Sequence, residues 1–311
     1  MREHRFAVAT AFATFALLVI GGLVHPTGSS LACPDWPLCN GQVFPTMHGG
    51  VLYEHGHRLA ALTVAFLTVS LAALVFRART DPTLRRLALG AVLLVGVQAS
   101  LGAFTVIFKL PLLVSASHLG VSIAFFCLVI LLAHRLRPEG AYAPAQPRRL
   151  VGLATAAVYL QIVLGALVRH TGAALACGTD IGLCEGRLWP AWGPAELHML
   201  HRLNGYLVAA LVVAAGLGAW RRLGGGASPQ GGPPVRRALA LAAPALVVAQ
   251  VGLGLFTVAS YVSLPVVSLH LATGAMLLAD LLLLFLQLGP RGARTEATGL
   301  ERSLDLAATP G

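Results

Sequence analysis

The chain has 311 residues, of which 57% are hydrophobic and only 11% are charged, and its mean hydropathy is +0.78. About 25% of the residues of a typical soluble domain are charged. The composition therefore excludes a soluble globular protein and indicates one that lies in a lipid bilayer. The formal net charge of +10 would also suit a nucleic-acid-binding protein, so the positions of the charges must decide between the two classes.

Eight apolar runs are long enough to be membrane spans. About 20 apolar residues in a helix cross the roughly 30 Å hydrocarbon core of a bilayer. The first run continues into a cysteine-containing loop rather than a small-residue cleavage site, so we interpret it as a span and not as a cleavable signal peptide. The sequence predicts an all-α integral membrane protein with eight transmembrane helices. They lie at about 6–24, 51–76, 87–108, 112–133, 150–169, 196–219, 238–259 and 265–288.

The basic residues cluster beside alternate ends of these spans, which the positive-inside rule assigns to the cytoplasm. Both termini are therefore predicted to be cytoplasmic, in a protein of the cell (plasma) membrane. The positive charge sets orientation, and we expect no nucleic-acid partner. Seventeen of the 22 Lys and Arg residues follow this pattern: Arg2, Arg5, Arg77, Arg79, Arg85, Arg86, Arg135, Arg137, Arg148, Arg149, Arg221, Arg222, Arg236, Arg237, Arg291, Arg294 and Arg302.

Two loops on the predicted outer side share a motif. The first is GGLVHPTGSSLACPDWPLCNG at 21–41, and the second is GALVRHTGAALACGTDIGLCEG at 165–186. Both keep a Thr-Gly, a Leu-Ala-Cys and a closing Cys-x-Gly. A motif with this much in common indicates a duplicated unit.

Each of these loops contains two cysteines. Thiols outside the cytoplasm are oxidised, so we interpret Cys33 with Cys39, and Cys177 with Cys184, as two disulfides. The alternative is a metal site, which requires thiolates in a reducing compartment and usually a Cys-x-x-Cys spacing.

The repeat extends beyond the loops. A shift of 144 residues carries HGHRLAAL at 55–62 onto MLHRLNGY at 199–206, and a shift of 152 residues carries QASLGAFT at 98–105 onto QVGLGLFT at 250–257. Each half therefore has four spans and forms one four-helix bundle. Because four is an even number, the halves share one orientation and form a pseudo-symmetric parallel repeat. The predicted parts are a first bundle at 1–138, a cytoplasmic linker at 139–149, a second bundle at 150–288 and a cytoplasmic tail at 289–311.

Four histidines occupy equivalent positions in this repeat: His57, His118, His201 and His270. Each lies about one to two turns inside the outer end of an even-numbered span. A lone histidine inside a membrane is usually a packing residue, but an intramembrane ionisable group is also a functional candidate. Two histidines on facing helices are a common way to hold a cofactor in a four-helix bundle, and imidazole is a common axial ligand of haem iron. We predict that each half holds a haem between its two histidines.

Other polar and small residues accompany the histidines. Gln98, Gly102 and Thr105 share one helical face, which favours either close helix packing or room for a cofactor. The second half repeats this face at Gln250, Gly254 and Thr257. Arg58 and Arg202 directly follow a histidine. Each is interpreted either as an interfacial side chain that reaches water or as a partner of a haem propionate.

Glu54 breaks the symmetry of the repeat, because the residue at the equivalent position of the second half is His198. It lies three residues before His57, so both side chains are predicted on one helical face. Glu54 could be solvated near the outer membrane surface. If it faces the bundle instead, it is a candidate for acid–base chemistry.

These features together resemble the haem A synthase family of bacteria and mitochondria. The resemblance rests on TGSSLACPDWPLCNG, on EHGHR and HMLHR at the starts of two helices, and on the helices of His118 and His270, and it covers about residues 6–288. It implies an oxidoreductase acting on a CH or CH2 group. The reaction implied is oxidation of the methyl group at position 8 of haem O to a formyl group, which gives haem A for cytochrome oxidase.

The resemblance also implies roles for individual residues. His201 and His270 would ligate the iron of a haem b cofactor, His57 and His118 would hold the haem O substrate, and Glu54 would act in the chemistry. Haem O synthase, a protohaem farnesyltransferase, would supply the substrate. One alternative is a di-haem electron carrier resembling cytochrome b561. The other is a transporter, which would need charged residues at mid-depth that the spans lack apart from Asp280.

Overall fold

The computed structural model describes residues 2–78, 81–137, 148–191, 193–224 and 234–289. All eight predicted spans are confirmed as helices long and apolar enough to cross a membrane. A short 3₁₀ turn, η1 (Ala173–Leu175), precedes α6. The helices are α1 (Arg2–Val24), α2 (Gly49–Arg77), α3 (Pro82–Ile107), α4 (Leu112–Arg135), α5 (Arg148–His170), α6 (Gly193–Gly224), α7 (Pro234–Ala259) and α8 (Leu264–Gln287).

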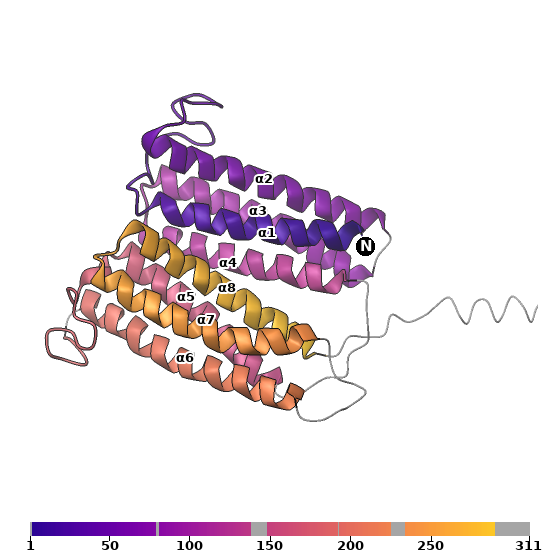
Figure 1. The fold of residues 1–311 in the computed structure, drawn as a ribbon. Helices are drawn as coiled ribbons and strands as arrows, with labels where there is room; N and C mark the ends of the chain where they lie inside the picture. The colour runs from indigo at the N-terminus through magenta and orange to yellow at the C-terminus, as the bar shows by residue number, and fades with distance from the viewer. Residues whose placement is uncertain (1, 79–80, 138–147, 192, 225–233, 290–311) are drawn as a thin grey trace, which may run out of the picture.

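The helices pack as two groups of four (Figure 1). In the first group α1 packs against α2 and α4, and α3 also packs against α2 and α4, so the ring of neighbours is closed. The helices α5 to α8 pack in the same cyclic order. The two groups meet through α1, α4, α5 and α8. This order places α2 opposite α4, and α6 opposite α8, across the middle of each bundle.

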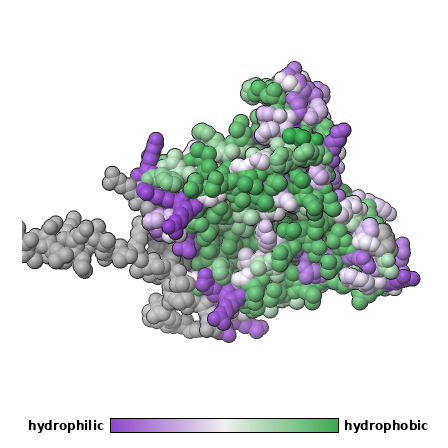
Figure 2. All heavy atoms as spheres, turned by 180° about the vertical axis from the view of Figure 1, so that it is seen from behind, coloured by the Kyte–Doolittle hydropathy of each residue, from purple (hydrophilic) through white to green (hydrophobic). Residues whose placement is uncertain are grey.

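The helices run along one common direction, and their middles present a broad apolar surface with hydrophilic residues gathered toward the two ends (Figure 2). This is the pattern of a multi-pass membrane protein. The N-terminus lies at one end of the molecule, whereas the loops that follow α1 and α5 lie at the other (Figure 1). The predicted linker and tail fall almost entirely outside the described residues, although α5 begins at Arg148, inside the predicted linker.

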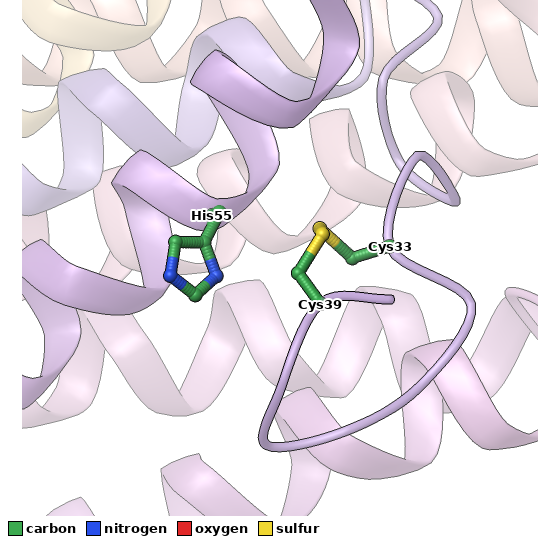
Figure 3. A group of neighbouring side chains, drawn as sticks. All are labelled: Cys33, Cys39 and His55. Atoms are coloured by element: carbon green, nitrogen blue, oxygen red, sulfur yellow. A yellow bond between two sulfur atoms is a disulfide. The ribbon is translucent and has the colours of Figure 1, made fainter. Parts of the chain in front are cut away.

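Both predicted disulfides are confirmed. Cys33 is bonded to Cys39 (Figure 3) and Cys177 to Cys184. Each closes a short loop, and in each loop the second cysteine pairs with the backbone three residues later, at Gln42 or Arg187. The two loops therefore have the same local architecture, as the repeated motif predicts.

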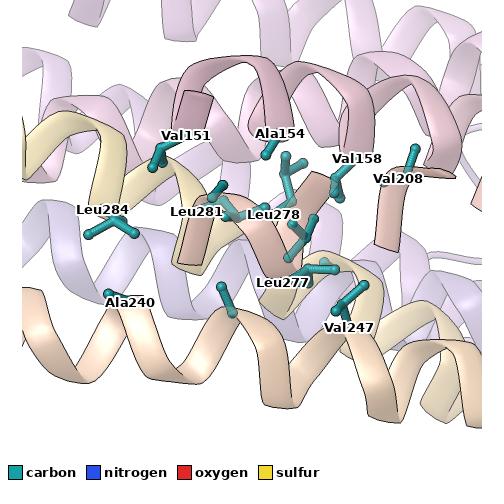
Figure 4. Close-up of a cluster of buried hydrophobic side chains, with 14 of the residues drawn as sticks. Val151, Ala154, Val158, Val208, Ala240, Val247, Leu277, Leu278, Leu281 and Leu284 are labelled. Carbon is teal, nitrogen blue, oxygen red and sulfur yellow. The ribbon is translucent and has the colours of Figure 1, made fainter. Parts of the chain in front are cut away.

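The core of the second bundle is made of small and branched side chains (Figure 4). Val151, Ala154 and Val158 of α5 face Leu277 and Leu281 of α8, and alanines of α6 and α7 complete the cluster. Lipid is as apolar as these side chains, so helices in a membrane associate through close packing rather than through hydrophobic burial. The alanines allow that close approach below the level of the histidines.

Candidate functional site

Each of the four histidines lies against a glycine of a neighbouring helix. A Cβ atom on any of these glycines would come within 2.8–3.2 Å of the imidazole Cε1 atom, which is closer than ordinary van der Waals contact. The glycines thus create the space in which the rings lie. The pairs are His57 with Gly21, His118 with Gly102, His201 with Gly165, and His270 with Gly254.

The histidines of each half come from opposite corners of a bundle. His57 is on α2 and His118 on α4, while His201 is on α6 and His270 on α8. In a closed ring of four helices, residues of opposite helices at similar depth face one another across the core. Each bundle therefore has one histidine on each of two opposite helices, and histidines on facing helices are a common way to hold a cofactor in a four-helix bundle.

A cavity of about 470 Å³ lies in the second bundle. His201 and His270 both line it, and so do Gly165 and Gly254. Its volume falls within the roughly 300–1,000 Å³ of small-molecule and cofactor sites. The donor set, the cavity and the glycines beside the two rings fit a haem in this half.

Several buried polar atoms around the histidines have no hydrogen-bond partner among the described residues. They are Nδ1 of His57, Nδ1 of His270, Oε1 of Gln98 and Oε1 of Gln250. Buried polar atoms are normally satisfied, so unpartnered atoms beside the rings are what a ligand site at the histidines predicts. Both halves contain such atoms, which agrees with one ligand site in each bundle.

The glutamines on the odd-numbered helices position the rings. Nε2 of Gln98 donates to Nδ1 of His118 (2.9 Å), and Nε2 of Gln250 lies 3.3 Å from Nε2 of His270. The polar face predicted for these helices is therefore directed at the histidines. Sequence analysis left packing and cofactor space as alternatives, and Gly102 and Gly254 make room for an imidazole in either case.

The two sites differ in polarity beside their first histidine. In the second half, Nε2 of Gln161 donates to Nδ1 of His201 (3.0 Å), and Nδ2 of Asn204 donates to Oε1 of Gln161 (2.6 Å). The shift of 144 residues places Leu17 and Ala60 at the equivalent positions of the first half. The first histidine of the second half therefore has hydrogen-bonding neighbours, whereas the equivalent positions in the first half are apolar.

Glu54 is buried, with only 4% of its surface exposed. Its Oε1 atom accepts a hydrogen bond from Nη2 of Arg58 (2.6 Å), and its Oε2 atom accepts one from the backbone N–H of Cys33 (2.8 Å). The carboxylate is therefore held at the base of the first disulfide loop and is not an isolated solvated group. It lies in the second turn of α2, the helix that carries His57.

Arg58 has a role that sequence analysis did not anticipate. Besides Glu54, it donates to the carbonyls of Cys33 (3.1 Å), Asp35 (2.7 Å) and Leu38. It thus fixes the loop onto α2. In the second half Arg202 donates to Nε2 of His198 (2.9 Å) and to the carbonyl of Asp180 (2.6 Å), so the loop contact is shared.

Asp35 stabilises the tip of the first loop. Its carboxylate accepts hydrogen bonds from the backbone N–H groups of Asn40 (2.6 Å) and Gly41 (2.9 Å). These bonds favour the ionised form and lower the pKa of Asp35 below its usual range. Asn40 and Gly41 both adopt positive φ angles, of 52° and 74°, which turns their N–H groups toward the carboxylate.

The residues between the two bundles at the outer end were not predicted from the sequence. His25 and Arg169 both line the cavity, and Nη2 of Arg169 donates to the carbonyl of Gly22 (2.9 Å). The rings of His25 and His170 lie 5.4 Å apart. Burial and the nearby Arg169 cation lower the pKa of His25. The position of His25 next to the repeated Thr-Gly was the available signal.

The known proteins to which this chain is similar belong to one family. The family model COX15-CtaA, described as a cytochrome oxidase assembly protein, matches residues 4–282. The haem A synthase of Bacillus pumilus is 31% identical over 67% of this chain and 72% of its own length. That of Bacillus licheniformis is 31% identical over 69% and 74%. That of Halalkalibacterium halodurans is 33% identical over 68% and 74%.

Proposed function

Because the chain belongs to the haem A synthase family of cytochrome oxidase assembly proteins, we propose that it converts haem O to haem A by oxidising the methyl group at position 8 to a formyl group. The observation that carries this proposal is the presence of two imidazole pairs, one in each bundle, with a buried carboxylate beside only one of them. One pair is suited to a cofactor and the other to a substrate.

The second bundle is the proposed site of the cofactor, haem b. His201 and His270 would be its axial ligands, and the cavity that they line supports the assignment. A haem with two axial imidazoles has no open iron position, so it would supply electron transfer rather than oxygen chemistry. The side-chain amide of Gln161, 3.0 Å from Nδ1, would fix the orientation of the His201 ring.

The first bundle is the proposed site of haem O. His57 and His118 would hold the porphyrin, with Gly21 and Gly102 leaving room for their rings. The apolar residue Leu17 stands where the second half has Gln161. An apolar wall of this kind suits a substrate that carries a farnesyl-derived tail and must leave after reaction.

Glu54 is the proposed proton acceptor. Conversion of a methyl group to a formyl group consumes one water and releases four protons together with four electrons, which haem b would pass on to an electron acceptor outside the chain, so a nearby base is needed. Glu54 lies on the helix of His57 and is held by Arg58 and the N–H of Cys33. A carboxylate fixed in this way can take a proton at Oε2 and pass it toward the outer surface.

The proposed setting is the plasma membrane, with both termini in the cytoplasm and the disulfide loops outside. The arginines beside alternate helix ends support this orientation. A farnesyltransferase that makes haem O would supply the substrate, and cytochrome oxidase would use the product. Arg58 and Arg202 remain proposed propionate contacts, although both also bind loop carbonyls.

The experiment that tests the function is haem extraction from cells that make haem O but no haem A. Expression of the chain should give formyl-bearing haem in the membrane extract. The Glu54→Gln variant, produced at the same level, should give haem O or the alcohol intermediate. A protein that binds two haems but yields no formyl haem would support the cytochrome b561-like alternative instead.

A further inference from the structure

A second cluster of potential ligands lies at the outer end of the first bundle, away from the proposed haem sites. It consists of Cys33, Cys39 and His55, and all three are buried. Their ligand atoms, two sulfurs and an imidazole nitrogen, lie within 4.8 Å of one another. Figure 3 shows the His55 ring beside the disulfide, with one ring nitrogen on the side of the sulfurs.

The hydrogen bonding of His55 leaves one nitrogen free to act as a ligand. Its Nε2 atom lies 2.9 Å from the carbonyl oxygen of Val43. A carbonyl only accepts, so in the neutral ring Nε2 carries the proton and Nδ1 carries the lone pair. Nδ1 is buried and has no hydrogen-bond partner within the described part of the chain. A metal-binding histidine has this arrangement, with one nitrogen anchored to a carbonyl and the other free.

We propose that reduction of the Cys33–Cys39 disulfide turns this cluster into a Cu(I) site with two thiolates and Nδ1 of His55 as ligands. A dithiol, such as a Cys-x-x-Cys thiol–disulfide oxidoreductase, would donate two electrons and two protons and become a disulfide itself. The S–S bond breaks and two thiols form. Binding of Cu(I) then forms two Cu–S bonds and one Cu–N bond and releases both thiol protons.

The ligand set favours Cu(I) over other ions. Thiolates select soft ions such as Cu(I) and Zn(II) rather than Mg²⁺ or Ca²⁺. Structural zinc sites are almost always four-coordinate and tetrahedral, whereas this cluster provides three ligands and Cu(I) accepts trigonal coordination. With the roughly 2.3 Å and 2.0 Å that zinc forms to sulfur and nitrogen as a guide, a trigonal centre needs ligand atoms about 4 Å apart. The three ligand atoms lie within 4.8 Å of one another, and the two sulfurs, bonded to each other in the disulfide, would move apart after reduction to reach that geometry.

The repeat provides an internal comparison. The shift of 144 residues places Met199 at the position of His55, and Met199 packs against Cys177 and Cys184. The second loop thus lacks the imidazole. A copper–nitrogen bond in the reduced protein can therefore be assigned to the first loop, and Met199 offers a matched control variant.

The test uses the purified full-length protein, reduced with a phosphine and titrated with Cu(I) against a competing Cu(I) chelator. X-ray absorption should detect Cu–S and Cu–N bonds in the reduced wild type, and the oxidised protein should bind no Cu(I) at this site. His55→Phe should lose the Cu–N signal. Its affinity should fall by at least the roughly 10–100-fold that loss of a supporting contact costs a metal site. Met199→Leu should keep the Cu–N signal.

Two further measurements distinguish the loss of a copper ligand from a general loss of loop structure. Thiol alkylation before and after reduction should show that His55→Phe still forms the Cys33–Cys39 disulfide, so a loss of copper cannot be due to a disordered loop. Zn(II) should not displace Cu(I) when supplied in equal amounts. The proposal is overturned by Cu(I) binding that is unchanged in His55→Phe or in Cys33→Ser/Cys39→Ser, or by preference for Zn(II). Haem A production plays no part in these readouts.

Discussion

The backbone N–H of Cys33 donates to Oε2 of Glu54 at 2.8 Å, which ties the first disulfide loop to the start of α2. Arg58 bridges the same two elements, because it donates both to Glu54 and to the Cys33 carbonyl. The proposed proton acceptor and the disulfide loop are therefore one structural unit. A substitution at Glu54 acts on chemistry and on loop position together, and experiments must separate the two effects.

Glu54→Gln should abolish haem A formation with little effect on the loop. The amide oxygen can still accept the bond from Cys33, but an amide cannot take up a proton. Loss of a general base typically lowers the rate by about 10²–10⁴-fold. Extracted haems should contain haem O or the alcohol and normal haem b. Normal haem A output from this variant would remove Glu54 from the mechanism.

Glu54→Ala serves as the comparison. It removes one of the partners of the partly buried Arg58 and the acceptor of the Cys33 N–H, which should destabilise the loop by about 1–3 kcal/mol. Protease cleavage between residues 29 and 48 should therefore be faster in Glu54→Ala than in Glu54→Gln. Equal cleavage in the two variants would contradict the structural role assigned to the carboxylate.

Replacement of either histidine of the second half should remove the haem b spectrum. His201→Ala and His270→Ala each remove one of the two proposed ligands of the haem iron. The cavity that both residues line would then no longer hold the haem. His57→Ala and His118→Ala should keep the haem b spectrum but lose haem O binding. Visible spectroscopy of the four purified variants checks this, and an unchanged spectrum in His201→Ala would overturn the ligand assignment.

The sequence was sufficient to predict the spans, both disulfides and the helices that carry the histidines. The length of the apolar runs predicts the spans. Of the eleven histidines, the four that occupy equivalent positions in the repeat are the predicted ligands. The repeat would also have identified Gly21 and Gly165, since they are 144 residues apart, but a glycine in an apolar helix has no meaning until its neighbour is known. Only packing shows that each lies against an imidazole.

The loop contacts could not be predicted in the same way. The pairing of Glu54 with Arg58 follows from their i, i+4 spacing, yet the three loop carbonyls bound by Arg58 depend on how the loop folds back. His55 lies two residues before His57, so the two side chains do not share a helical face. Facing away places it under the disulfide loop, where its ring contacts Val43. The sequence predicts which face of the helix His55 is on, but it does not predict which loop residues pack against that face.

Gly254→Ala should disturb the haem b site, whereas Gly252→Ala should not. A Cβ at position 254 would lie 3.1 Å from Cε1 of His270, so the ring must shift by a few tenths of an ångström. A Cβ at position 252 meets no atom within 4 Å and faces outward. A shifted axial ligand should change the reduced spectrum and weaken haem retention by roughly tenfold. Identical spectra for both variants would mean that the ring has more room than the structure gives it.

Gln161→Leu should make the second site resemble the first and weaken its hold on haem b. The substitution removes the donor to Nδ1 of His201 and leaves Asn204 without its acceptor. Loss of a partner that orients a metal-binding histidine typically costs about 10–100-fold in affinity or activity. Redox titration should also show a changed haem b potential.

Gln98→Leu is the matched control, because among the described residues the side-chain hydrogen bonds of Gln98 involve only His118 and Ser122 of the first half. It should leave haem b binding and its potential unchanged while reducing haem O turnover. If both variants alter the haem b potential equally, the two sites are coupled. That result would contradict the assignment of the cofactor to the second bundle and the substrate to the first.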